Sequence, residues 1–258
     1  MIRIVTTILL SVISLASIGR PTKSNVGGTH MLYGGVNTIP VYTAEDYVQD
    51  GLIAMWDGIE NAGYGVHDAS ATIWKDLIGT QDMTLSQYGS FSENSLVCAG
   101  GGFAASRGTL FDSFVYAEAV VEYDSLERQN GNIVIWGEYD GMIYYHRSMD
   151  LFIYSDMLLQ IGGSNLFYSK SATDKLFLLQ YSRPDSTDVF ALLNGNGLTT
   201  TTKTDYWATR YGIGYFGGRQ SGYSFRGKIM RVAMYSRIPT ASEIAANYAI
   251  DQARFNLP

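Results

Sequence analysis

The segment WDGIENAGYGVHD, residues 56–68, holds the side chains best suited to coordination chemistry. Asp57, Glu60, Asn61 and Asp68 offer carboxylate and amide oxygens, the hard donors that Ca²⁺ prefers in proteins. Their spacing is not that of an EF-hand loop, and a polar segment rich in glycine is also an ordinary connection between strands. The four residues are therefore candidate calcium ligands, with a plain surface connection as the alternative interpretation.

Aromatic side chains allow a second kind of chemistry, the stacking of flat rings on the faces of sugars. Such a site also needs amide, carboxylate or guanidinium groups nearby to bond the sugar hydroxyls. The chain has 19 tyrosines, so many of them must line sheet faces without contacting a ligand. The candidate ligand-binding residues are Tyr64, Tyr139, Tyr206, Trp207, Tyr215, Arg219 and Tyr223.

Composition and missing motifs exclude several other functions. The net charge is −6 with no cluster of Lys or Arg, and neutralising phosphates requires concentrated positive charge, so we expect no nucleic-acid partner. Cys98 is the only cysteine and lies in an apolar run, which predicts a buried thiol and excludes both an intrachain disulfide and a cysteine-based zinc site. The sequence contains no HExxH, GxSxG or GxxxxGK[ST] motif.

Residues 1–20 allow two interpretations. Arg3 is followed by an uncharged apolar stretch and then by small residues at Ser14–Ala16, a pattern typical of a signal peptide. Polar residues also recur at three- or four-residue spacing in this stretch, which favours a retained helical anchor that packs into a larger assembly. The uncharged run falls short of the ~20 residues that span a bilayer. Residues 21–46 are polar with glycine pairs and a proline, and we interpret them as a linker.

From residue 47 to residue 258 the hydrophobicity mostly follows the period of two that is typical of strands. In residues 114–123, for example, alternate positions are apolar, so one face of this strand is predicted to face a core. Short apolar segments follow, separated by turn-forming pairs such as Asn194-Gly195. Near the C-terminus, Thr240 and Glu243 form a capping box ahead of an apolar stripe. The chain is therefore predicted to be all-β, an antiparallel β-sandwich with a C-terminal capping helix and an N-terminal helical segment.

Two segments of this sequence resemble the ends of a known family. GLIAMWDGIENAGYGVHDASATIWKDLIG and FRGKIMRVAMYSRIPTASEIAANYAIDQARF are similar to the first and last parts of a concanavalin A-like, laminin-G-type jelly roll. The Asn-Gly hairpin stands between them in the expected order, and the resemblance covers residues 47–258. It implies a jelly-roll fold, which hosts lectins, adhesins, hydrolases and virion proteins. Short proteins of this kind resemble those of gut Bacteroidetes and their phages, and some laminin-G-type domains carry calcium at the rim.

The glycosidases among these jelly rolls carry a strand with the pattern Glu-x-Asp-x-(x)-Glu. The nearest match is the pair Glu118 and Glu122, with Val120 in place of the middle acid. Positions i and i+4 of a regular strand lie about 13 Å apart. Retaining chemistry needs carboxyl groups about 5 Å apart and inverting chemistry under about 10 Å. We therefore interpret the two residues as solvated glutamates on an outer sheet face and expect the chain not to be an enzyme.

These observations predict a non-catalytic binding or adhesion module at an extracellular or cell surface, with a glycan or surface polysaccharide as its partner. One alternative is a phage virion protein, such as a fibre, decoration or tail component, in which residues 1–20 anchor the chain to other virion or cell-surface proteins. The other alternative is a glycoside hydrolase with atypical carboxylates.

Overall fold

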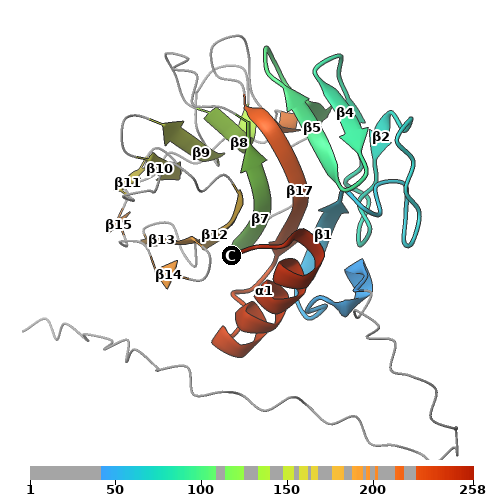
Figure 1. The fold of residues 1–258 in the computed structure, drawn as a ribbon. Coiled ribbons are helices and arrows are strands. Elements are labelled where there is room, and N and C mark those ends of the chain that lie inside the picture. Colours follow the sequence, from blue (N-terminus) through green and yellow to red (C-terminus); the bar gives the residue numbers. More distant parts are fainter. Residues whose placement is uncertain are drawn as a thin grey trace, which may run out of the picture. The chain divides into compact units, whose positions relative to one another are not determined.

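Strands with alternating apolar side chains build two antiparallel sheets around a shared core (Figure 1). The predicted helical segment in residues 1–20 and most of the predicted linker lie outside the described residues. All described residues belong to one compact unit, Pro40–Pro258. The structure, a computed structural model, describes residues 42–108, 114–124, 133–139, 148–153, 157–161, 164–167, 176–182, 188–193, 196–197, 201–202, 213–217 and 225–258.

The larger sheet carries the C-terminal helix and the last strand. Its strands are β1 (Leu52–Asp57), β4 (Gly89–Ser92), β5 (Ser95–Ala99), β7 (Tyr116–Tyr123), β12 (Leu176–Ser182), β13 (Asp188–Leu193), β14 (Asn196–Gly197), β15 (Thr201–Thr202) and β17 (Arg226–Tyr235). Within the described ranges these nine strands follow the order β14-β13-β12-β7-β17-β5-β4, with β1 also paired to β17 and β15 to β13.

The second sheet closes the other side of the core. Its strands are β2 (Ile73–Trp74), β3 (Met83–Leu85), β6 (Ala105–Arg107), β8 (Ile133–Tyr139), β9 (Ser148–Ile153), β10 (Met157–Ile161), β11 (Ser164–Phe167) and β16 (Ile213–Phe216). Their order is β11-β10-β9-β8-β16-β6-β3-β2, eight strands in the part of the chain that is described. The predicted all-β antiparallel sandwich is confirmed.

Aromatic side chains from both sheets form the centre of the core. Trp56 of β1 and Trp74 of β2 meet Phe216 of β16 edge to face, with ring centroids 5.1 Å and 5.6 Å apart. All three rings are fully buried, and edge-to-face pairs add to the free energy gained by burying such large apolar surfaces. Cys98 lies in the same core, where burial raises the pKa of its thiol. The prediction of a buried thiol is therefore confirmed.

The helix α1 (Ala241–Phe255) begins at the predicted capping box. The Glu243 N–H donates to Thr240 Oγ1 at 3.4 Å, and the Thr240 N–H donates to Glu243 Oε2 at 2.6 Å. The helix ends at Asn256, whose backbone is left-handed with φ 57° and whose N–H donates to the Gln252 carbonyl at 3.0 Å. No helix in the described ranges has the length and apolar character needed to cross a membrane.

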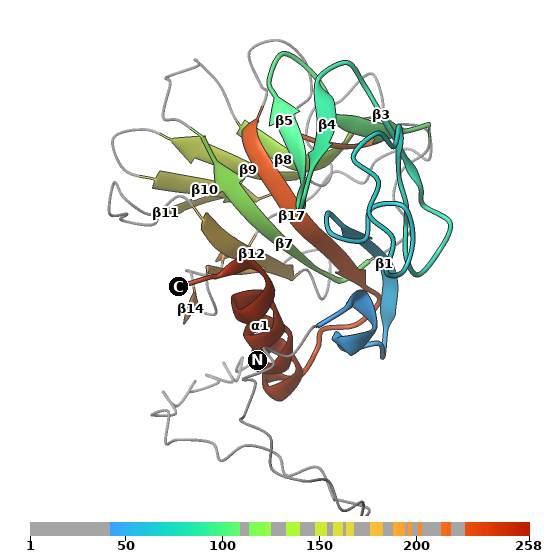
Figure 2. The same cartoon turned by 45° about the vertical axis from the view of Figure 1, so that its right-hand side comes forward.

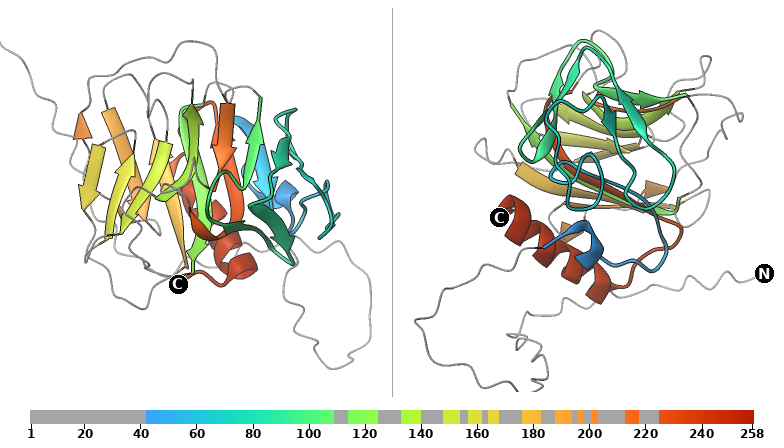
Figure 3. Two further views of the ribbon diagram at one scale, coloured as in Figure 1. Left: turned by 90° about the horizontal axis from the view of Figure 1, so that it is seen from above. Right: turned by 90° about the vertical axis from the view of Figure 1, so that its right-hand side faces the viewer.

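The helix packs on the face of the larger sheet that points away from the core (Figures 2 and 3). Val120 of β7, Leu178 of β12 and Met230 of β17 contact its end, where Phe255 and Leu257 are buried. The helix therefore caps the sandwich as predicted.

Residues 42–48 lie against this helix and belong to the packed body, although the sequence pattern assigned residues up to 46 to a linker. The short 3₁₀ helix η1 (Ala44–Asp46) and Tyr47 share an apolar cluster with Ile250 of α1. The Val48 N–H donates to Asn247 Oδ1 at 3.0 Å. The first and last described segments of the chain are thus held together.

The strand β17 organises the larger sheet because three strands pair with it. It pairs with β7 along one edge, while β5 and β1 follow each other along the opposite edge. At their junction the Gly58 N–H donates to the Met230 carbonyl at 2.7 Å. A Cβ atom on Gly58 would lie 2.4 Å from both the Asn94 carbonyl oxygen and the Ser95 Cα. Only glycine fits at this close approach of two backbones.

Gly58→Ala tests this constraint. The added methyl group meets backbone rather than a flexible side chain, so we expect the free energy of unfolding to fall by about 3 kcal/mol, the upper part of the usual range for overpacking. Urea unfolding measures the change. Gly108→Ala is the matched control, because a Cβ there meets nothing within 4 Å, and we expect it to change stability by less than about 0.5 kcal/mol. Equal stability losses in the two variants would contradict the argument.

Candidate functional site

Residues 58–72, here called the rim loop, connect β1 to β2 and contain most of the candidate calcium ligands. Asp57 begins the loop from the end of β1, where its Oδ1 accepts from the Ile59 N–H at 2.8 Å and from the Glu60 N–H at 3.2 Å. A carboxylate that accepts from the next two or three N–H groups is a standard way to start a turn. Asp57 thus shapes the first turn of the loop.

Two further side chains of the segment hold the loop from inside. Glu60 Oε2 accepts from the Gly65 N–H at 3.0 Å, and Glu60 Oε1 accepts from the Ala44 N–H at 2.8 Å. Asn61 Nδ2 donates to the Asp68 carbonyl at 2.7 Å, and the Asp68 N–H donates back to Asn61 Oδ1 at 2.8 Å. Glu60 and Asn61 are buried, and of these bonds the one from Ala44 is buried while the other three are partly buried. The loop has a defined conformation.

The tip of the rim loop presents an aromatic ring. Tyr64 stands between Gly63 and Gly65, whose φ angles of 138° and 67° suit glycine. Gly63 and Val66 form an isolated antiparallel bridge across the tip. The Tyr64 side chain is 42 % exposed and Val66 is 51 % exposed. One predicted sugar-stacking residue therefore lies on a surface projection with a fixed backbone.

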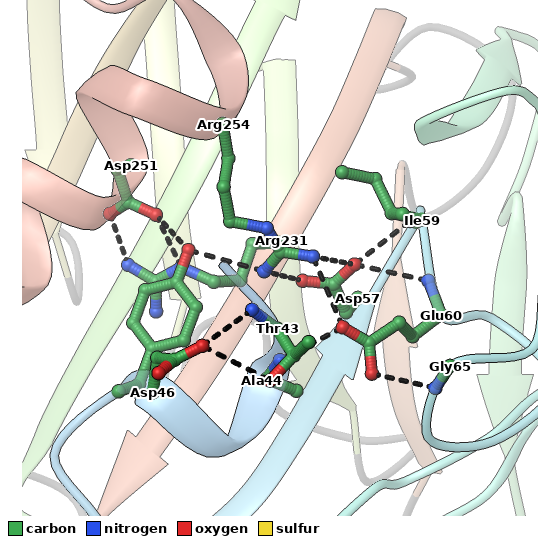
Figure 4. Close-up of polar contacts among 12 residues, drawn as sticks. Thr43, Ala44, Asp46, Asp57, Ile59, Glu60, Gly65, Arg231, Asp251 and Arg254 are labelled. Atoms are coloured by element: carbon green, nitrogen blue, oxygen red, sulfur yellow. Dashed lines mark hydrogen bonds and ion pairs between the residues drawn. The ribbon is translucent and has the colours of Figure 1, made fainter. Parts of the chain in front are cut away.

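The candidate calcium ligands already have partners within the protein, and Figure 4 shows those of Asp57 and Glu60. The Arg254 guanidinium of α1 donates to both Asp57 oxygens, at 2.6 Å and 3.1 Å, and to Glu60 Oε1 at 3.3 Å. The Asp68 carboxylate accepts from the Ser70 N–H and hydroxyl at 2.8 Å and 2.6 Å, and these bonds lower its pKa. Over the described residues, no group of three or more His, Cys, Asp or Glu side chains is placed to hold a metal ion. Calcium binding stays a prediction, and the contacts fit the alternative, a structured connection.

The interpretation of Glu118 as a solvated glutamate is wrong. Its side chain is fully buried beneath α1, where Arg231 Nη2 donates to Glu118 Oε2 at 2.9 Å. Glu122, in contrast, is partly exposed and pairs with Lys228 at 3.1 Å. Strand alternation placed both glutamates on the outer face of β7 correctly, but the helix covers that face at Glu118.

Arg231 links the sheet to the helix. Besides contacting Glu118, it donates to Asp251 of α1 through Nε at 2.8 Å and through Nη2 at 2.5 Å. Tyr47 donates its hydroxyl proton to Asp251 Oδ1 at 2.7 Å, and its ring lies 4.5 Å from the Arg231 guanidinium carbon. Arg231 and Asp251 are fully buried, so each needs the other's charge to offset desolvation.

Carboxylates outnumber guanidinium groups beneath the helix. We call the six charged side chains there the buried charge network: Asp57, Glu60, Glu118, Arg231, Asp251 and Arg254. Burial is the largest cause that raises the pKa of Asp57 and of Asp251, and the paired arginines oppose that rise. No sequence pattern described above predicted this network, although Arg231 in the apolar run KIMRVAMY was an indication of it.

The other predicted sugar-binding residues are placed only in part. Tyr139 ends β8 and Tyr215 lies on the neighbouring strand β16, where Ile213 pairs with Tyr139 and Tyr215 pairs with Gly137. Two of the predicted positions therefore lie on adjacent strands, two residues out of register. The remaining candidates lie outside the described residues: Tyr206, Trp207, Arg219 and Tyr223.

No protein-family model and no curated protein matches the chain, whereas several solved structures do. Trypanosoma rangeli sialidase in complex with sialic acid matches with a TM-score of 0.61 and 16 % identity, over 79 % of this chain and 33 % of the sialidase. The same sialidase as a covalent intermediate with 2,3-difluorosialic acid matches with a TM-score of 0.57 and 17 % identity, over 79 % of this chain and 34 % of the sialidase. The binding domain of Paraclostridial Mosquitocidal Protein 1 matches with a TM-score of 0.53 and 11 % identity, over 77 % of this chain and 52 % of that domain's chain. At these identities the likeness shows the fold, and the chain spans about a third of the sialidases.

The sialidase matches correct the expectation that the chain is not an enzyme. Sialidases are glycoside hydrolases, so the fold comparison contradicts that expectation. The spacing of Glu118 and Glu122 was tested against a rule for carboxylate pairs, and sialidases are exceptions to it because their nucleophile is a tyrosine. The distance between two glutamates on one strand therefore excludes less than we inferred.

The raised pKa values predict how stability depends on pH. Because burial raises the pKa of Asp57 and Asp251, these groups take up protons on acidification at a higher pH in the folded state than in the unfolded chain. This stabilisation is complete below the unfolded-state pKa of about 4 and is lost as pH rises through the higher folded-state pKa. We therefore expect urea unfolding to give a larger free energy at about pH 5 than at about pH 7.

Asp251→Asn is the comparison for this pH dependence, because it keeps the shape of the side chain and removes its titration. We expect a smaller gain on acidification in this variant. The pKa of Glu243 is lowered to about 2, mainly by its hydrogen bond with Arg237. Its contribution to stability is therefore lost on acidification, but only at pH values below its ordinary pKa. Identical pH profiles for the two proteins would contradict the prediction.

We expect added calcium to leave the melting temperature unchanged, because Arg254 already donates to the carboxylate oxygens of Asp57 and Glu60. A folded-state site with calcium at a hundred times its Kd would stabilise the protein by about 2.7 kcal/mol, which a thermal melt detects easily. EDTA-treated protein without added calcium is the reference. A rise in melting temperature that Mg²⁺ does not reproduce would instead support the predicted calcium site.

Proposed function

We propose that the chain is a glycan-binding β-sandwich domain of the concanavalin A-like, laminin-G type, with Tyr64 of the rim loop as a sugar contact. The observation that carries the proposal is the partly exposed Tyr64 ring on a loop held by hydrogen bonds from the buried side chains of Glu60 and Asn61. The fold likeness to a sialidase in complex with sialic acid, and to a toxin's binding domain, supports it.

The rim loop has the properties that sugar recognition requires. An aromatic ring offers a flat apolar surface for stacking, and polar groups nearby bond the hydroxyls. The same loop exposes His67, Asp68 and Ser70, which supply a ring nitrogen, a carboxylate and a hydroxyl group. Because Glu60 and Asn61 hold the backbone, less conformational entropy is lost on binding than in a loose loop.

The register of the second sheet supports a further contact region within the same proposal. Tyr139 and Tyr215 occupy nearby backbone positions of β8 and β16, so the proposal includes both as candidate sugar contacts. The proposal concerns recognition, and whether the chain also cleaves a glycan is measured in the same experiment.

A glycan array with sialylated and neutral glycans, probed with the full chain, tests the proposal, and calorimetry on the best glycan measures affinity. Truncating an aromatic anchor costs on the order of 2 kcal/mol, so we expect Tyr64→Ala to weaken binding about 30-fold. Tyr64→Phe keeps the ring and should stay within a few-fold of the wild type. Release of free sialic acid or reducing sugar is assayed on the same glycans.

Ile238→Ala is the control, because Ile238 is also 40 % exposed but lies in the segment before α1. We expect it to bind as the wild type does. An array without any bound glycan would remove the proposed function, and unchanged affinity in Tyr64→Ala would remove Tyr64 from the site.

A further inference from the structure

The Arg254 side chain links the C-terminal helix to the rim loop by charge. It leaves the last turn of α1, is 3 % exposed, and donates to Asp57 and Glu60 as described above (Figure 4). Its guanidinium also lies 5.6 Å from the Tyr47 ring centre and donates to the Tyr47 hydroxyl at 3.3 Å. A planar group held by charge and by an aromatic ring has little freedom to take another position.

Glu60 connects this arginine to the tip of the loop. Its Oε1 accepts from Arg254 and from the Ala44 N–H, while its Oε2 accepts from the Gly65 N–H, next to Tyr64. One carboxylate therefore joins the C-terminal helix, the segment before β1 and the residue that follows the exposed ring.

The arrangement requires the positive charge of Arg254. Burial raises the pKa of Asp57, the nearby Glu60 carboxylate adds to that rise, and Arg254 opposes it. Without the guanidinium, two carboxylates would share a buried site with no cation, and one of them must then take up a proton or turn towards water. Either change weakens the hydrogen bond that the Gly65 N–H donates to Glu60, or the turn that Asp57 starts.

We infer that Arg254 is a positioning residue, which sets the conformation of the rim loop and thereby the orientation of Tyr64. The part of this inference that concerns ligand binding rests on the proposed function. The part that concerns the loop rests on contacts within the chain alone. Docking of the C-terminal helix is then a condition for glycan binding at a loop that lies almost 200 positions earlier in the sequence, since Arg254 and Asp57 are 197 residues apart.

Amide hydrogen exchange on the full chain tests the loop part without any ligand. In Arg254→Gln we expect the Gly65 and Ala44 amides, which donate to Glu60, to exchange at least about tenfold faster, because local opening becomes easier. Arg254→Lys keeps the charge and should recover part of the protection. It also keeps the test valid if the glutamine variant folds poorly.

Arg237→Gln is the matched control, because Arg237 lies just before the start of α1, at the opposite end of the helix from Arg254. Arg237 is partly exposed and pairs with Glu243 and Asp50. We expect it to accelerate exchange at Ile244, in the first turn, and to leave Gly65 unchanged. The inference would be overturned if the Gly65 amide of Arg254→Gln exchanged at the wild-type rate. Equal acceleration of Gly65 exchange in both variants would overturn it as well.

Binding of sialyllactose, or of the best array glycan, tests the functional part. We expect Arg254→Gln to weaken binding by a factor similar to that of Tyr64→Ala, about 30-fold, with partial recovery in Arg254→Lys. Faster exchange at Gly65 with undiminished binding would overturn the link to Tyr64. Faster exchange in a protein that binds no glycan in any form would support the loop part and contradict the proposed function instead.

Discussion

Arg231 points from the middle of β17 into a space that α1 closes to water, and a charge in that position must be neutralised there. Glu118 and Asp251 do this from the sheet and from the helix. Removing one partner of a buried pair leaves an uncompensated charge, which destabilises a protein more than the intact pair stabilises it. We interpret the network as fixing where the helix docks, since apolar residues of similar size could fill the space at equal or higher stability. The placement of Tyr47, Asn247 and Arg254 follows from that docking.

Local patterns in the sequence predicted much of the fold. Alternation in residues 114–123 placed Ala117, Ala119 and Val121 in the core, and the Thr240–Glu243 box marked the start of the helix. Alternation also assigned Glu118 to the outer face of its strand, but it carries no information on whether another element covers that face. The relevant indication was the coincidence of two charges in apolar settings, Arg231 in a strand and Asp251 in the helical stripe.

The candidate site shows the same limit. The sequence identified the segment around Asp57 and Glu60 from its residue types, yet oxygen donors in a loop fit a cation, a guanidinium or backbone N–H groups equally well. Which of these they contact depends on Arg254, and no local pattern connects residues so far apart. The rule for carboxylate spacing was likewise too narrow, because glycoside hydrolases include sialidases, whose nucleophile is a tyrosine. A fold limits where a site can lie, and its chemistry depends on particular side chains.

The pairing of β17 with both β1 and β7 has a consequence for biosynthesis. During translation β1 and β7 leave the ribosome long before residues 226–235 exist, so the larger sheet cannot assemble until β17 has been synthesised. Until then β1 and β7 present unpaired backbone edges, which attract other nascent strands. Contacts over such long sequence separations also make folding slow. While it is still bound to the ribosome, the chain therefore exposes strand edges that other chains can pair with, and a chaperone that covers such edges would prevent this.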